Sequence, residues 1–166
     1  METNEKNVQK DIVEQVIEAM NREFEYWFEE YPDVDESDIW WVYRDGEYKH
    51  VTNLAEKEGD LAVHYFKNAY CPLYAQLLSE LFEGGQVLYS ERHVIFSYNG
   101  QYYDAGGKYT EDTSLYDTIT LTPTFIMEFC AEYPYTDSNQ ELYAKMKTKG
   151  EEVLKTNKGM QLQFKQ

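Results

Sequence analysis

The chain has 166 residues, of which 31 are acidic and 15 are Lys or Arg, so its formal net charge at pH 7 is −16. This length predicts one domain with a hydrophobic core large enough to fold without disulfide bonds. Two cysteines are too few for a disulfide framework, and the three histidines lie too far apart in the sequence for a zinc site. We therefore expect neither a metal nor another cofactor.

The first residues and the hydropathy pattern exclude several locations. The stretch METNEKNVQKDIVEQ lacks the basic and apolar regions of a signal peptide. No apolar run approaches the roughly 20 residues that a membrane helix needs. The sequence therefore predicts a cytoplasmic protein with reduced thiols that does not enter a membrane. A net negative charge also argues against direct binding of nucleic acid.

The negative charge is concentrated in the first part of the chain. Residues 1–60 hold 18 acidic and 6 basic side chains, whereas residues 139–166 hold 3 acidic and 6 basic ones. Two interpretations stay open: an acidic surface that keeps the protein soluble, and a mimic of nucleic acid that occupies the basic groove of a partner protein. In the second interpretation, the partner binds the acidic run EEYPDVDESD. Its charged residues are Glu29, Glu30, Asp33, Asp35, Glu36 and Asp38.

Hydrophobic periodicity predicts a long amphipathic helix near the N-terminus. Apolar residues recur at helical spacing over residues 4–30, and Pro32 follows them. The sequences IWWVY and EYKHVT flank the turn Arg44-Asp45-Gly46 and predict a β-hairpin. A second helix is expected over residues 53–67, because a capping box opens this stretch.

The middle of the chain predicts a helix followed by several strands. Pro72 favours the first turn of a helix, so we expect a helix from Cys71, as its N-cap, to the pair Gly84-Gly85. The strand QVLYS follows, then the hairpin HVIFSYNGQYYD with its turn at Asn99-Gly100, then the strand TSLYDTITL. The stretch FIMEFCAEY fits either a strand or a short helix, in which Cys130 is a buried hydrophobic residue.

The last part of the chain predicts a helix from the capping box of Ser138 and Glu141 to about Lys155. The tail TNKGMQLQFKQ fits a final edge strand or a disordered end. Helices, then strands, then a helix indicate an α+β fold in which helices pack on an antiparallel sheet. The expected single domain, residues 1–166, has three parts: an N-terminal helix with a hairpin (1–52), a core (53–125), and a C-terminal helix with a tail (126–166).

The hairpin HVIFSYNGQYYD places a histidine and an aspartate on one face of the sheet. With a two-residue turn at Asn99-Gly100, Phe96 faces Tyr103, and alternate side chains point to the same face. His93 and Asp104 are then diagonal neighbours within reach of each other. A register slip of one residue would separate them. A second interpretation stays open, in which His93 only begins a strand and Asp104 only caps its own turn.

Cys71 at the start of a helix completes a candidate catalytic group. A helix dipole and free N–H groups stabilise a thiolate, and a nearby imidazolium lowers the pKa of a thiol further. In this arrangement Cys71 attacks an acyl carbon, His93 transfers the proton, and Asp104 holds the imidazole tautomer. The alternative is that Cys71 is a buried residue at the helix cap.

The stretch NAYCPLYAQLLSELFEGGQVLYSERHVIFSYNGQYYDAGGKY, residues 68–109, resembles the core of transglutaminase-like and papain-like cysteine proteins. It is most similar to small bacterial and phage proteins with a cysteine at a helix start, a strand that opens with His-Val, and a Gly-x-Tyr-Tyr-Asp-x-x-Gly return strand. The resemblance implies a helix packed on an antiparallel sheet. It also implies that Cys71, His93 and Asp104 form a catalytic triad.

Two classes of function follow from these observations. The first is a cysteine-dependent acyl-transfer enzyme: an amidase, a peptidase or a transglutaminase-like protein. It requires an accessible Cys71 thiol of low pKa close to His93. The second is a non-catalytic acidic inhibitor or decoy, for instance a phage-encoded one, that binds a basic nucleic-acid-processing or host-defence protein. It requires a salt-sensitive complex that does not depend on Cys71.

Overall fold

The computed structural model describes residues 10–30, 41–44, 47–50, 62, 63, 66, 70–91, 93–130 and 137–165. These residues form four helices and seven strands, which confirms the expected α+β class. The helices are α2 (Ile12–Glu30), α5 (Cys71–Leu81), α6 (Pro123–Phe129) and α7 (Asp137–Lys165). The strands are β1 (Trp41–Arg44), β2 (Glu47–His50), β3 (Gln86–Ser90), β4 (His93–Tyr98), β5 (Gln101–Asp104), β6 (Gly107–Lys108) and β7 (Asp117–Ile119).

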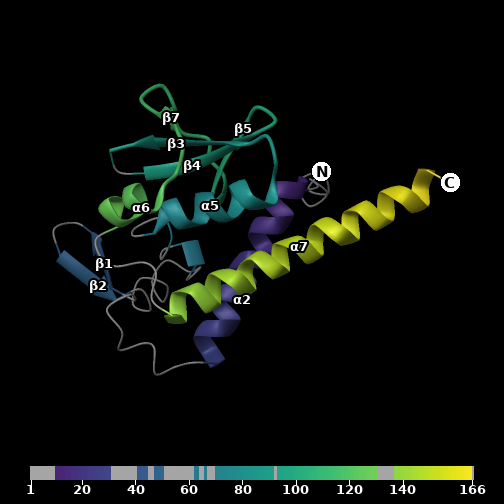
Figure 1. Cartoon of the computed structure of the whole chain (residues 1–166), viewed down its shortest axis with the longest axis horizontal. Helices are drawn as coiled ribbons and strands as arrows, with labels where there is room; N and C mark the ends of the chain where they lie inside the picture. The colour runs from purple at the N-terminus through teal and green to yellow at the C-terminus, as the bar shows by residue number, and fades with distance from the viewer. Residues whose placement is uncertain are drawn as a thin grey trace, which may run out of the picture.

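Five of the strands form an antiparallel sheet in the order β6-β5-β4-β3-β7 (Figure 1). The hairpin of β4 and β5 has the expected register, in which Phe96 pairs with Tyr103. Asn99 and Gly100 have positive φ angles of 52° and 78°, which a two-residue hairpin turn of this kind requires. The sequence therefore predicted both the turn and the register of this hairpin correctly.

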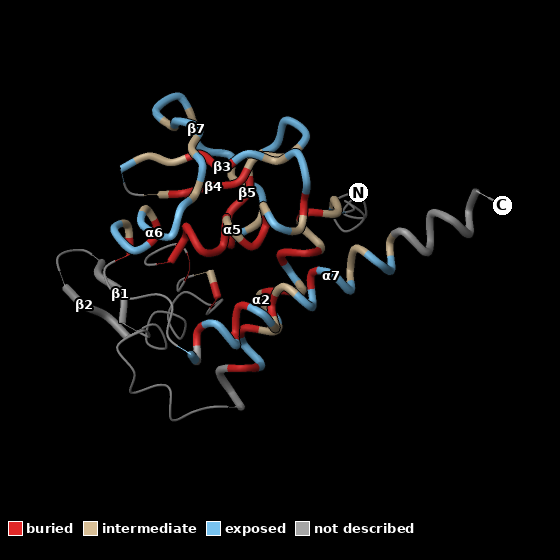
Figure 2. The backbone as a smooth tube through the Cα atoms, viewed as in Figure 1, coloured by how far each residue is buried: buried red, intermediate tan, exposed pale blue. Residues whose placement is uncertain are grey.

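Helix α5 lies between this sheet and the pair formed by α2 and α7 (Figure 1). On one side it packs mainly against β4, and on the other the Tyr74 hydroxyl donates a hydrogen bond to Asn21 Oδ1 of α2 at 2.7 Å. A helix that is apolar on almost all sides is stable only when it is enclosed in this way. Figure 2 shows α5 as an almost continuous buried segment. Its buried residues are Cys71, Pro72, Leu73, Tyr74, Ala75, Leu77 and Leu78.

Helix α2 begins later than the sequence predicted and is anchored to the sheet at its first turn. Residues 1–9 lie outside the described part of the chain, and Asp11 is the cap rather than a helical residue. The Glu14 N–H donates to Asp11 Oδ1 at 2.8 Å, and the Asp11 N–H donates to Glu14 Oε1 at 3.1 Å. The second Asp11 oxygen accepts a 2.6 Å hydrogen bond from the Tyr103 hydroxyl of β5. Helix α2 therefore contacts the sheet at Tyr103, the residue before Asp104.

Helix α7 lies beside α2, and its C-terminal end extends beyond the other described elements (Figure 1). The expected helix end at Lys155, followed by an edge strand or a disordered tail, is wrong, because the helix runs to Lys165. The tail contains Lys, Met, Gln and Leu, which are good helix formers, so one glycine does not end the helix. The expected start at Ser138 is also wrong, since Asp137 is already helical.

The structure corrects or completes five further expectations. The strand predicted for TSLYDTITL is reduced to the three residues of β7. The ambiguous stretch FIMEFCAEY begins within helix α6, which Thr122 caps by accepting the Phe125 N–H at 3.1 Å. Cys130 follows α6 and is buried, as expected.

Strands β1 and β2 form the predicted hairpin, whose turn lies outside the described residues. Of the helix predicted over residues 53–67, only residues 62, 63 and 66 are described, and they are helical.

Gly150 of α7 allows three helices to approach one another closely. A Cβ atom at Gly150 would lie 2.7 Å from Leu81 Cδ1 of α5 and 3.2 Å from Val16 Cγ1 of α2. We therefore expect Gly150→Leu to lower the free energy of unfolding by about 1–3 kcal/mol, because the core would be overpacked. The matched control is Glu151→Leu, at the exposed neighbouring position. Thermal unfolding followed by circular dichroism compares the two variants, and equal melting temperatures would contradict this packing.

Candidate active site

Cys71 is the first residue of α5, and its position differs by one residue from the expectation. The N-cap is Tyr70, whose carbonyl accepts the N–H groups of Leu73 at 3.1 Å and Tyr74 at 3.4 Å. The expectation that Cys71 itself is the N-cap is therefore wrong. The thiol still lies in the first turn of the helix, where the backbone N–H groups carry partial positive charge.

His93 and Asp104 contact each other directly, as the predicted register required. His93 Nε2 lies 3.0 Å from Asp104 Oδ2, and Asp104 Oδ1 accepts the Gly106 N–H at 2.8 Å. The side chains are 13% and 6% exposed. An ionised carboxylate only accepts hydrogen bonds, so Nε2 carries the proton in this pair. The second ring nitrogen, Nδ1, is then the basic one in neutral His93.

Cys71, His93 and Asp104 line the same internal cavity, although they come from three different elements. The Val94 N–H is hydrogen-bonded to the Cys71 sulfur, so the thiol lies beside the backbone of β4 immediately after His93. The cavity has a volume of about 10 Å³. That is at the lower limit for one water molecule. Its other lining residues are Phe66, Tyr74, Ala75, Leu78, Val94, Tyr103 and Ala105.

The Cys71 thiol is not the accessible, low-pKa group that the sequence led us to expect. Cys71 is 4% exposed, and this burial raises the pKa of its thiol to about 12. The Val94 N–H lowers the pKa, but the nearby Cys130 and Asp104 side chains raise it further. The cost of placing a thiolate in an apolar core therefore outweighs the stabilisation from the helix N-terminus. At neutral pH the resting residue is a thiol.

Two tyrosines that sequence reasoning did not select complete the surroundings of the imidazole. The rings of His93 and Tyr109 have centroids 5.7 Å apart and are tilted by 42°. The Tyr109 hydroxyl lies 2.9 Å from the Tyr116 hydroxyl. Burial, then the contact with Tyr116, then Glu111 raise the pKa of Tyr109 well above its ordinary value. The signal in the sequence was only a tyrosine that follows β6, five residues after Asp104.

The acidic run proposed to bind a partner lies mostly outside the described residues. Glu29 and Glu30 end helix α2, and their side chains are not described. Asp33, Asp35, Glu36 and Asp38 lie outside the described part of the chain altogether. This surface therefore stays a prediction from the sequence.

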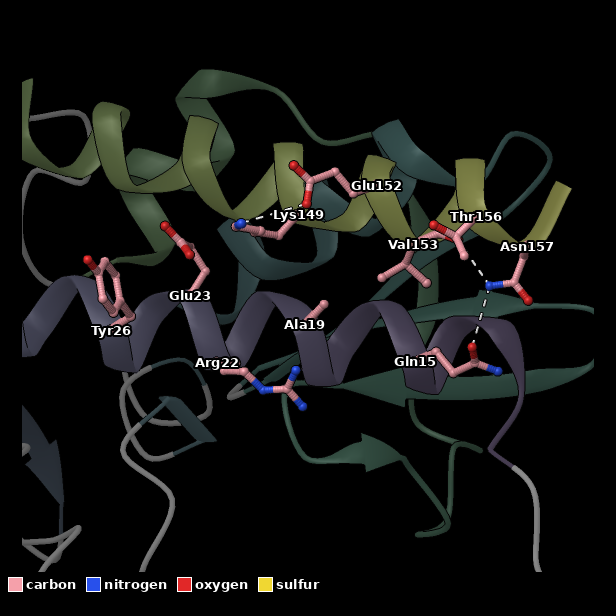
Figure 3. A pocket seen from close by; sticks show the side chains of 10 residues that line it. All are labelled: Gln15, Ala19, Arg22, Glu23, Tyr26, Lys149, Glu152, Val153, Thr156 and Asn157. Atoms are coloured by element: carbon pink, nitrogen blue, oxygen red, sulfur yellow. Dashed lines mark hydrogen bonds and ion pairs between the residues drawn. The ribbon is translucent and has the colours of Figure 1, made fainter. Parts of the chain in front are cut away.

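A larger hollow of about 800 Å³ lies between α2 and α7 (Figure 3). It shares no lining residue with the cavity at Cys71. Its polar groups contact one another: Lys149 is 3.6 Å from Glu152, and the Asn157 amide donates to Gln15 Oε1 at 3.4 Å. The Lys149 and Glu152 charges and the Asn157 and Gln15 amides are therefore paired with each other within this hollow.

The described part of the chain offers neither a metal site nor a membrane-spanning helix. There, no group of three His, Cys, Asp or Glu side chains is arranged to hold a metal ion. Within the same residues, no helix combines the length and apolar character needed to span a bilayer.

Comparison with known protein families, with curated proteins and with solved structures finds no match for this chain. The resemblance of residues 68–109 to transglutaminase-like and papain-like cysteine proteins therefore stays a prediction. The function is therefore inferred from the geometry and chemistry of Cys71, His93 and Asp104.

The raised pKa of Cys71 predicts how alkylation depends on pH. The folded pKa of about 12 exceeds the unfolded value, so the thiol stays protonated as the pH rises through 9. At pH 8 we expect iodoacetamide to modify native Cys71 on the order of 10³-fold more slowly than the urea-unfolded chain. The same difference stabilises the folded state below about pH 9, and this contribution is lost as the pH rises toward 12. Mass spectrometry at Cys71 measures the rates, and a reactivity midpoint below 8.5 would contradict the buried thiol.

Proposed function

We propose that this protein is a cysteine-dependent acyl-transfer enzyme, of the amidase, peptidase or transglutaminase-like kind, with Cys71 as its nucleophile. One observation carries the proposal: the His93 imidazole is hydrogen-bonded to Asp104 and borders the same cavity as the Cys71 side chain. A nucleophile, a base and a group that orients the base are the parts that acyl transfer through a covalent intermediate requires.

Cys71 is buried and its pKa is raised, so the accessible thiol of low pKa that the sequence argument required is absent from this structure. The proposed reaction therefore starts from a thiol rather than a thiolate. As the Cys71 sulfur attacks the acyl carbon, the S–H bond breaks and the proton passes to His93 Nδ1. The new S–C bond forms, the bond from the acyl carbon to its leaving group breaks, and Nδ1–H protonates that group. Water or an amine then attacks the thioester, with Nδ1 again accepting the proton. The C–S bond breaks, and Nδ1–H returns that proton to the Cys71 sulfur, which regenerates the thiol. Asp104 stabilises the imidazolium in each step.

The environment of Cys71 supports concerted proton transfer. A thiol whose pKa is raised to about 12 is a poor nucleophile by itself, so attack depends on a base in contact with it. The backbone N–H groups of Val94 and of Cys71 itself lower the pKa of the thiol. After attack, these groups are candidate donors to the oxyanion. A cavity of about 10 Å³ has no room for an acyl group, so catalysis requires the lining side chains to move when substrate enters.

Acylation by p-nitrophenyl acetate tests this proposal, because the chain contains its own control. Burial raises the pKa values of Cys71 and Cys130 alike, to about 12. We expect mass spectrometry to detect the acetyl thioester on Cys71 and not on Cys130. His93→Ala should slow acylation of Cys71 by about 10²-fold or more, since it removes the base. Asp104→Asn should also slow it, because the amide does not select the Nε2–H tautomer.

The proposal fails if both cysteines react at the same rate, or if Cys71 reacts equally fast without His93. Circular dichroism of each variant verifies that the fold is retained. Iodoacetamide labelling in urea verifies that both thiols are free.

The second candidate is the acidic decoy, and the enclosed thiol favours it. A protonated Cys71 in a cavity of about 10 Å³ is what a non-catalytic packing residue would look like. The net charge of −16 supplies an attraction for a basic partner.

The decoy proposal predicts a complex controlled by salt rather than by Cys71. The immobilised protein should retain a basic protein at low ionic strength and release it at roughly 1 M salt, where the Debye length is about 3 Å. Neutralising the six acidic residues of the run at residues 29–38 should weaken capture, whereas Cys71→Ala should not. Capture that resists salt, or that is unchanged by neutralisation, would count against the decoy.

A further inference from the structure

We infer that Tyr109 is a positioning residue for the His93 imidazole, holding the ring so that Nδ1 remains available to Cys71. This inference rests on the proposed function. It concerns a residue outside the Cys71, His93 and Asp104 group, and three structural observations carry it.

The hydrogen bond to Asp104 does not by itself fix the imidazole. This hydrogen bond holds one ring atom, His93 Nε2, at 3.0 Å from Asp104 Oδ2, so small rotations about χ1 and χ2 of His93 can still tilt the plane of the ring. Such a tilt would change where Nδ1 lies and what it can reach. A second contact on the ring is needed to remove this freedom.

Tyr109 supplies the second contact. Its ring centroid is 5.7 Å from that of His93, at a tilt of 42°, which lies in the range of favourable aromatic pairs. The same separation lies within the roughly 6 Å at which an aromatic ring attracts a cation. The Tyr109 ring is therefore placed both to orient the neutral imidazole and to stabilise the imidazolium that acyl transfer forms.

Tyr109 is itself held from two directions. Its N–H donates to the Tyr102 carbonyl at 2.8 Å, which attaches it to the end of the sheet. Its hydroxyl lies 2.9 Å from that of Tyr116, and the two rings are in edge contact at 5.8 Å. Burial and the contact with Tyr116 raise the pKa of Tyr109, and its hydroxyl is protonated at neutral pH as that of an ordinary tyrosine is. Tyr116 thus holds the orientation of the Tyr109 ring. Tyr109 and Asp104 together hold the orientation of the His93 ring.

Among the residues that the structure describes, Asp104 is the charged group that contacts His93. Cys71, from α5, is a thiol at neutral pH, and Tyr109 is an uncharged phenol. The role assigned to Tyr109 is therefore one of shape and polarisability, which a phenyl ring retains and an aliphatic side chain does not.

Nitrogen-15 NMR of histidine-labelled protein tests this role without any substrate. Hydrogen exchange of the His93 Nε2–H and the ring-current shifts of its carbon-bound protons are measured in wild type, Tyr109→Phe and Tyr109→Leu. We expect Tyr109→Leu to accelerate exchange by about two- to tenfold and to remove the ring-current shift. Tyr109→Phe should retain both signatures.

Tyr98→Leu is the matched control. It removes a ring at the other end of β4, whose partner is Phe82 at 5.1 Å, and so deletes an aromatic contact of the same kind. The His93 signals should not respond to it. Unchanged exchange and shifts in Tyr109→Leu would overturn the inference. Equal changes in Tyr109→Phe and Tyr109→Leu would also overturn it, by assigning the effect to the hydroxyl pair rather than to the ring.

The acylation assay gives the second readout and separates the two proposals. In Tyr109→Leu, acylation of Cys71 should slow by about two- to tenfold, and in Tyr98→Leu it should not change. If wild-type Cys71 is not acylated at all, the proposed function fails. The NMR comparison still decides whether Tyr109 orients the imidazole, because it needs no reaction at Cys71.

Discussion

The burial of helix α5 between the sheet and the pair of α2 and α7 is the constraint on which the rest of the structure depends. Because α5 is apolar on almost all sides, it is stable only if layers cover both of its faces. The Asp11–Tyr103 hydrogen bond and the Tyr74–Asn21 hydrogen bond fasten α2 to the sheet and to α5. Because Gly150 has no side chain, α7 packs closely against α5 and α2 and completes the layer on this side of α5.

This burial also determines the chemistry open to Cys71. The same packing that brings the thiol beside Val94 and into one cavity with the His93–Asp104 pair removes it from water. Its pKa therefore rises, although a helix N-terminus alone would lower it. Under the proposed function, attack by this thiol depends on direct proton transfer to an oriented imidazole. Under that proposal, the contacts of His93 with Asp104 and Tyr109 matter more to the reaction than the helix dipole does.

Particular residues show which parts of the structure the sequence predicted correctly and which parts it did not. The pair Asn99-Gly100 predicted the turn, the turn predicted the register, and the register predicted that His93 meets Asp104. Each step depends on local geometry with a period of two, which a sequence displays directly. Helix ends were predicted less well: α2 begins at Ile12, and α7 continues to Lys165. These limits depend on caps and on packing against distant segments, such as the contact of Asp11 with Tyr103.

The sequence by itself determined the α+β class, the hairpin and the meeting of His93 with Asp104, because periodicity and turn chemistry are properties of neighbouring residues. Only the tertiary structure decided that Cys71 is enclosed and that its pKa is raised, since burial depends on segments far away in the chain. It also decided that Tyr109 lies against the imidazole, with Tyr116 at its hydroxyl. A loop brings these rings together, and no sequence period encodes a contact of that kind.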